Sequence, residues 1–144
     1  MRLSQFSDYS IRTLLYLGSN TDRLSTVKEI SEAYGISRNH LVKVVHNLSQ
    51  MGVIETFKGS NGGIRLAADA ENLKLGALLK KLEQDESAFV ECFSDEGKCV
   101  INNVCKLKGI LKHSYNLFFK DLDRYTLKDI TCKKSTLMET FAQL

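Results

Sequence analysis

Between residues 27 and 66 the apolar positions change from a helical to a strand spacing, and this change constrains the fold most strongly. Two helical stretches, 27–34 and 37–51, are separated by Gly35, and each begins beside a serine or threonine suited to a helix N-cap. The runs 53–57 and 64–66 are rich in β-branched and aromatic residues and flank a turn with three glycines. This pattern predicts a helix, a turn, a second helix and then a β-hairpin.

Helix–turn–helix followed by a glycine-rich hairpin is the order of a winged helix-turn-helix. Helical spacing also predicts a helix over 5–19, one over 73–83, a long helix beginning at Asn102 or Asn103, and a short last helix over 126–131. The expected fold class is therefore mainly α with a small β-hairpin wing: a winged helix-turn-helix plus a long dimerisation helix. We assign residues 1–83 to the DNA-binding domain, 103–131 to the dimerisation and C-terminal helices, and 132–144 to a C-terminal tail.

The long helix carries an apolar seam with steps of three and four residues: Val104, Leu107, Leu111, Tyr115, Phe118, Leu122 and Tyr125. Such a seam suits pairing with another helix. We expect it to pair two copies of the chain as a homodimer, because a small winged domain has little surface to cover so long a helix. Packing against its own domain is the alternative.

The basic excess of the chain lies entirely in its first half. Residues 1–67 hold eight Lys or Arg against five Asp or Glu, and residues 68–144 hold twelve of each, which leaves the net charge of +3 in the first half. Such a distribution is expected if that half meets phosphate, although a chance asymmetry would also produce it. The apolar runs are short and the first residues lack a signal core, so we expect a cytoplasmic protein with no membrane partner.

The second helix of a helix-turn-helix shows its first residues to base edges in the major groove. Arg38 has the donors to bind a guanine and Asn39 those to bind an adenine, while Lys43 suits a phosphate. The wing reaches phosphate or the minor groove. The candidate residues for contacting a double-stranded DNA operator are thus Ser37, Arg38, Asn39, His40, Lys43, Lys58, Ser60, Asn61 and Arg65. A solvated polar helix face and an ordinary hairpin are the alternative interpretation.

Three of the four cysteines, Cys92, Cys99 and Cys105, lie close together in a C-x6-C-x5-C arrangement. A zinc ribbon usually has close C-x2-C pairs, whereas thiolates spaced along a loop suit the soft iron and sulfide of an iron–sulfur cluster. We therefore expect a cluster-binding loop over residues 84–106. The alternatives are structural cysteines, a thiol–disulfide switch, or a zinc site completed by an acid or by His113.

The sequence resembles the Rrf2 family of bacterial winged-helix transcription regulators over nearly its whole length. The resemblance is carried by the Ser37–His40 run, the wing Asn61–Leu66, the three cysteines, and Phe6, Asp8 and Tyr9 near the start. The helix and wing motifs are most similar to the branch that senses nitric oxide. The resemblance implies a homodimer that binds a near-palindromic operator.

Iron–sulfur clusters usually take four protein ligands, so a fourth is needed beside the three cysteines. In the nitric-oxide-sensing branch, an aspartate at the place of Asp8 is the fourth ligand and comes from the other subunit. The resemblance therefore implies that role for Asp8, whose alternative role is a helix N-cap. IscR-like members carry a histidine shortly after the third cysteine, and this chain has none there. Cys132 is expected to be a bystander.

From these observations we expect a cluster-dependent DNA-binding repressor that senses nitric oxide through cluster damage. A 4Fe-4S cluster is favoured and a 2Fe-2S cluster is the second choice. A regulator that senses iron or cluster status, or one based on zinc or thiols, is the alternative. The sequence lacks a nucleotide-binding motif and a C-x-x-C motif, so we do not expect an enzyme.

Overall fold

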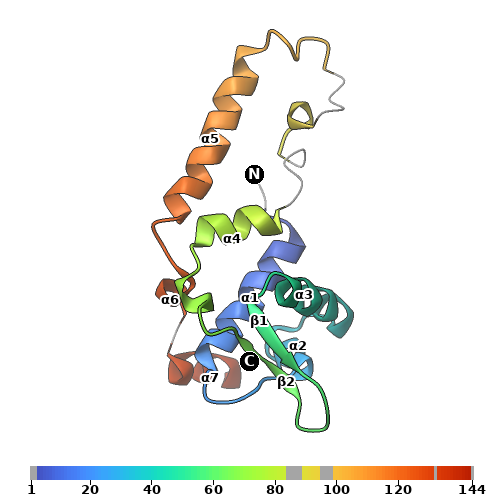
Figure 1. The fold of residues 1–144 in the computed structure, drawn as a ribbon, viewed down its shortest axis with the longest axis vertical. Helices are drawn as coiled ribbons and strands as arrows, with labels where there is room; N and C mark the ends of the chain where they lie inside the picture. Colours follow the sequence, from blue (N-terminus) through green and yellow to red (C-terminus); the bar gives the residue numbers. More distant parts are fainter. Residues whose placement is uncertain (1–2, 84–88, 95–98, 132, 144) are drawn as a thin grey trace.

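The computed structural model describes residues 3–83, 89–94, 99–131 and 133–143. It is mainly helical with one two-stranded antiparallel hairpin (Figure 1). The elements in chain order are α1 Gln5–Ser19, α2 Val27–Tyr34, α3 Arg38–Gln50, β1 Ile54–Phe57, β2 Gly63–Leu66, α4 Leu75–Leu82, α5 Lys106–Leu122, α6 Leu127–Ile130 and α7 Lys134–Ala142, with the 3-10 turns η1 Ala70–Asn72 and η3 Glu91–Phe93.

The core of the winged domain lies where α1, α2 and α3 meet. Its fully buried apolar side chains are Leu14 of α1, Ile30 of α2, and Leu41, Val44 and Leu48 of α3. Gly35 ends α2 in the left-handed conformation, with φ 64°, which a residue with a side chain adopts only at a cost. This turn directs α3 across α2, so the predicted helix–turn–helix is confirmed.

The hairpin is attached to the residues that precede α2. Glu55 pairs with Arg65 in the antiparallel register, and Ser25 adds a bridge to Ile64 through N–O distances of 2.9 and 2.7 Å. A side chain at Gly63 would collide with the backbone oxygen of Ser25, so glycine permits this close approach. The predicted wing is therefore confirmed, and its base is fixed to the helix–turn–helix.

Helix α5 leaves the winged domain as an arm, and only its C-terminal half packs against α4 (Figure 1). The buried residues of this contact are Leu79 of α4 with Tyr115 and Phe119 of α5. Of the predicted seam, Tyr115 is buried in this contact and Phe118 and Leu122 pack against it, whereas Leu107 is exposed. An apolar edge of α5 stays exposed: Leu107, Ile110 and Leu117 are 58%, 62% and 47% exposed, and the last two were not part of the predicted seam.

Two differences from the sequence prediction exceed two residues. Helix α5 begins at Lys106, and not at Asn102 or Asn103, so Cys105 is its N-cap instead of a residue of its first turn. The other difference is α7, which lies where the sequence predicted no helix. Phe141 of α7 packs its ring against Tyr34 at 5.0 Å and Tyr16 at 6.0 Å, and these tertiary contacts support a helix whose own pattern is weak. Within the described residues, no helix is both long and apolar enough to cross a membrane.

Candidate functional site

The start of α3 presents a row of polar side chains to solvent. Ser37 caps the helix by accepting a hydrogen bond from the backbone N–H of His40 at 3.3 Å. The apolar stripe of α3 faces the core, so the opposite face is left for the candidate DNA-contacting residues. All of these are exposed: Ser37, Arg38, Asn39, His40 and Lys43.

The wing exposes a second group of candidates, Lys58, Ser60, Asn61 and Arg65. The tip turns at Gly59, whose φ of 105° strongly favours glycine. A side chain at Gly62 would collide with the backbone oxygen of Phe57, so the tip is bare where backbone could approach a phosphate. The wing projects from the end of the molecule opposite the α5 arm (Figure 1).

Two of the candidate arginines have acidic partners within the chain. The Nε of Arg65 lies 2.8 Å from Glu55 across the hairpin, and its guanidinium lies 4.9 Å from the Phe57 ring. An Nη of Arg38 lies 3.9 Å from Glu32 of α2. These pairs are about half exposed, and exposed ion pairs contribute little stability. Both arginines can therefore exchange an acidic partner for a nucleic acid at small cost.

The capping box of α2 fixes the first helix of the motif. The backbone N–H of Thr26 donates to Glu29 at 2.6 Å, and that of Glu29 donates to the Thr26 hydroxyl at 3.2 Å. Arg23 adds an ion pair at 2.8 Å. Burial alone would raise the pKa of Glu29, but the Thr26 hydrogen bonds and Arg23 outweigh it and lower the pKa. The Glu29 carboxylate is therefore held in its charged form.

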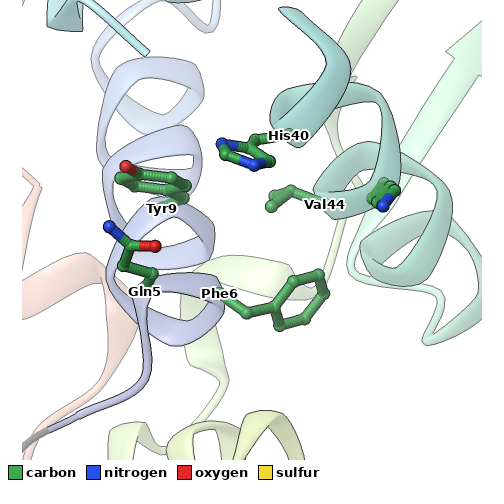
Figure 2. A pocket seen from close by; sticks show the side chains of 6 residues that line it. Gln5, Phe6, Tyr9, His40 and Val44 are labelled. Carbon is green, nitrogen blue, oxygen red and sulfur yellow. The ribbon is translucent and has the colours of Figure 1, made fainter. Parts of the chain in front are cut away.

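A small apolar pocket of about 180 Å³ lies between α1 and α3, behind the candidate recognition surface. Figure 2 shows the Tyr9 ring of α1 facing the His40 ring of α3, with Phe6 and Val44 deeper in the pocket. The two ring centroids are 5.9 Å apart. This contact between α1 and the first turn of α3 was not predicted, because the residues are 31 positions apart and no local pattern joins them.

Asp8 lies in the first turn of α1, one residue before Tyr9. Its carboxylate is 3.0 Å from the Nε of Arg12, and both side chains are nearly half exposed. The N-cap of α1 is Ser4, which accepts from the backbone N–H of Ser7 at 3.1 Å. The alternative role of Asp8 as an N-cap is therefore wrong, and its carboxylate faces solvent in a weak surface pair.

The three candidate cysteines are free thiols on or near the outer end of the α5 arm. Cys92 lies in η3 and is half-buried, Cys99 is exposed, and Cys105 is the half-buried N-cap of α5. Parts of the predicted loop, 84–88 and 95–98, and the bystander Cys132 lie outside the described residues. Among the residues that the structure does describe, no three His, Cys, Asp or Glu side chains are gathered closely enough to hold a metal ion.

The donor set suits an iron–sulfur cluster in chemistry, since three accessible thiols supply the soft ligands that such a centre takes. Their arrangement within one chain is incomplete, because Asp8 belongs to the winged domain and the thiols to the arm. Among the described residues, the three thiols and Asp8 are not gathered into one site.

Comparison with known proteins connects the whole chain to one group of regulators. Residues 3–133 match the Rrf2 family, described as an iron-dependent transcriptional regulator. The HTH-type transcriptional regulator NsrR of Halalkalibacterium halodurans is 45% identical, covering 95% of this chain and 94% of its own. The HTH-type transcriptional regulator NsrR of Bacillus subtilis is 41% identical, covering 96% of each chain.

Solved structures share the fold at low sequence identity. The global cysteine regulator CymR of B. subtilis has a TM-score of 0.69 at 20% identity, covering 94% of this chain and 98% of its own. T. potens IscR has a TM-score of 0.68 at 19% identity, covering 100% of this chain and 92% of its own. These likenesses show that the winged fold and its arm recur together.

Proposed function

The chain belongs to the Rrf2 family of iron-dependent transcriptional regulators, and on that premise we propose that it is an iron–sulfur-cluster-dependent repressor that senses nitric oxide through damage to its cluster. It is a DNA-binding transcription regulator and not an enzyme, in agreement with the regulators that it matches. We place its action in the cytoplasm, on a double-stranded DNA operator.

The proposal is carried by one observation: three free thiols, one in η3, one exposed and one at the N-cap of α5, are present in a chain 45% identical to a regulator named NsrR. Cys92, Cys99 and Cys105 would hold the cluster. When bound, it would supply iron with which nitric oxide reacts. A 4Fe-4S cluster is favoured over 2Fe-2S.

We further propose that the protein acts as a homodimer joined along the apolar edge of α5, formed by Leu107, Ile110 and Leu117. These side chains are 47–62% exposed, and their spacing of three and seven residues places them on one helix face. A second copy would cover this edge and place two recognition helices at neighbouring half-sites of an operator. In such a dimer, Asp8 of one subunit would complete the ligand set of the other.

The DNA-reading role is assigned to the exposed row Ser37, Arg38, Asn39, His40 and Lys43 and to the wing residues Lys58, Ser60, Asn61 and Arg65. Asp8 would connect this surface to the thiols, because its neighbour Tyr9 contacts His40. Holding Asp8 would fix the start of α1, and α1 would then hold the first turn of α3 in place. Release of Asp8 would remove that restraint.

Anaerobic purification of the full chain tests the proposal. We expect a coloured protein with iron and sulfide in equal amounts, tight operator binding, and loss of both colour and binding with nitric oxide. The affinity of the loaded and metal-free proteins would be compared at one salt concentration, because DNA affinity depends on salt. A colourless protein with stoichiometric zinc, or equal affinity of the two forms, would overturn it.

A regulator that responds to iron supply or cluster status is the alternative, because it needs the same labile centre. Treatment with an iron chelator in the absence of nitric oxide separates the two. The nitric-oxide proposal expects the loaded protein to keep operator binding under a mild chelator and to lose it with nitric oxide. The reverse result would favour an iron sensor.

A further inference from the structure

Two aromatic residues bracket Cys92 and both pack against α5. Phe93 directly follows Cys92, and its ring centroid lies 6.0 Å from that of Tyr115. Phe89 lies 5.2 Å from Tyr115 and 5.7 Å from Phe93. The short segment that carries Cys92 is therefore held on the same helix that Cys105 caps.

Lys112 adds a second attachment one helical turn away. Its ammonium nitrogen lies 4.9 Å from the centre of the Phe93 ring and 5.9 Å from that of Tyr115. A cation over an aromatic face is attracted to it. Lys112 and Tyr115 are three residues apart and thus share one face of α5.

Tyr115, on which Phe89 and Phe93 pack, is itself buried against other side chains. Tyr115 is only 6% exposed and packs with Phe119 at 4.9 Å and with Leu79 of α4. Phe89 and Phe93 pack on Tyr115, and Tyr115 packs on α4. Their position therefore depends on the packing of α4 against α5.

We propose that Phe89, Phe93, Lys112 and Tyr115, here called the Cys92 clamp, are positioning residues that set Cys92 for cluster binding. The inference rests on the proposed function, since it presupposes a cluster on the three thiols. A ligand on a loose segment must lose conformational entropy when it binds, and a segment that is already anchored loses less.

The clamp also limits where Cys92 can go. Lys112 is seven residues beyond Cys105, about 10 Å along the helix axis at 1.5 Å per residue. The clamp residues Lys112 and Tyr115 therefore hold the Cys92 segment roughly 10–15 Å along the helix axis from Cys105, and Cys99 is exposed.

Alkylation of the reduced, metal-free full chain tests the clamp itself. Each cysteine would be followed by mass spectrometry in wild type, Phe93→Leu and Tyr115→Leu. We expect the alkylation rate of Cys92 to rise about two- to tenfold in both variants, which is the change expected from losing one aromatic pair. The alkylation rate of Cys99 should not change. Phe93→Tyr keeps a ring and should restore the wild-type rate. Tyr125→Leu is the matched control, because it removes a ring that is 46% exposed and lies beyond the end of α5.

Iron release to a chelator from the anaerobically loaded proteins then tests the positioning role. We expect faster iron release from Phe93→Leu and Tyr115→Leu and wild-type release from Phe93→Tyr and Tyr125→Leu. Unchanged Cys92 alkylation would show that the clamp does not form, and wild-type iron release from the clamp variants would show that it does not position the ligand. A wild-type protein that takes up no iron–sulfur cluster would instead overturn the proposed function, and this inference with it.

Discussion

The ring of Tyr9 on α1 lies 5.9 Å from the ring of His40 in the first turn of α3, with their planes 32° apart (Figure 2). Tyr9 directly follows Asp8, and His40 stands among the residues assigned to reading DNA. One aromatic contact therefore joins the segment of the proposed fourth ligand to the start of the recognition helix. We propose that a movement of the first turn of α1 reaches α3 through this contact.

Replacing Tyr9 tests this connection. Tyr9→Leu keeps an apolar side chain but removes the ring that faces His40. We expect the ratio of operator affinity between loaded and metal-free protein to fall, with an unchanged cluster spectrum. Tyr9→Phe retains the ring and should keep the wild-type ratio, measured by fluorescence anisotropy at fixed salt. The same ratio in all three proteins would show that the contact transmits nothing.

Asp8→Ala tests the fourth ligand. We expect an altered visible or circular-dichroism spectrum and faster cluster loss in the loaded protein, because the carboxylate ligand is gone, while the metal-free protein binds DNA as wild type does. Arg12→Ala is the matched control, since it breaks the same 3.0 Å ion pair and leaves the carboxylate in place. If Arg12→Ala reproduced the change, the ion pair and not ligation would be responsible.

Arg38→Ala tests base reading at the start of α3. Loss of a bidentate hydrogen-bonded contact to a base is expected to weaken operator binding by roughly 1–3 kcal/mol. It should also reduce the preference for one base at that position of the operator. Lys43 is exposed and is proposed to contact phosphate, so Lys43→Ala should weaken binding to all sequences alike and reduce the salt dependence of binding by about one ion. Affinities for a panel of single-base operator variants distinguish these effects. Uniform weakening by Arg38→Ala would assign Arg38 to phosphate as well.

The α2 capping box predicts a pH-dependent contribution to stability. The folded pKa of Glu29 lies below its ordinary value of 4.5. The charged form is thus favoured by folding, and its contribution is present above pH 4.5 and lost as the pH falls through the folded pKa. We expect Glu29→Gln to lower the free energy of unfolding near pH 7, and the difference from wild type to shrink below pH 4.5. Denaturant titrations of the two proteins near pH 7 and below pH 4.5 measure this difference in the free energy of unfolding. A difference that grew in acid would contradict a lowered pKa of Glu29.

A substitution at Gly76 tests how α4 packs against the α5 arm. A side chain at Gly76 would collide with the backbone oxygen of Phe119 and with Asp123, so we expect Gly76→Ala to destabilise the protein by roughly 1–3 kcal/mol. Gly109 of α5 offers a control, because nothing lies within 4 Å of a side chain there. Gly109→Ala should be neutral or stabilising by about 0.5–1 kcal/mol, since alanine suits a helix interior better. Thermal unfolding of both variants compares them.

The sequence by itself determined the winged domain closely. The bounds of α1 and α2 are those predicted, and α3 and the hairpin agree with prediction to within a residue or two at their ends. Caps such as Thr26 and turn glycines such as Gly35 act on neighbouring backbone, so their signals are local and can be read along the chain. The exposure of the candidate DNA-contacting residues on α3 could also be predicted, because the apolar stripe of this helix determines which face is left to solvent.

Only the tertiary structure decided the parts that depend on distant contacts. The tail forms α7 because Phe141 packs on Tyr16 and Tyr34. The predicted seam of α5 is divided because one of its members, Tyr115, packs against Leu79 of α4. The Tyr9–His40 contact and the contacts of the Cys92 clamp with α5 join residues 19 to 31 positions apart. Their energies come from packing between elements, which the periodicity of a single element does not encode.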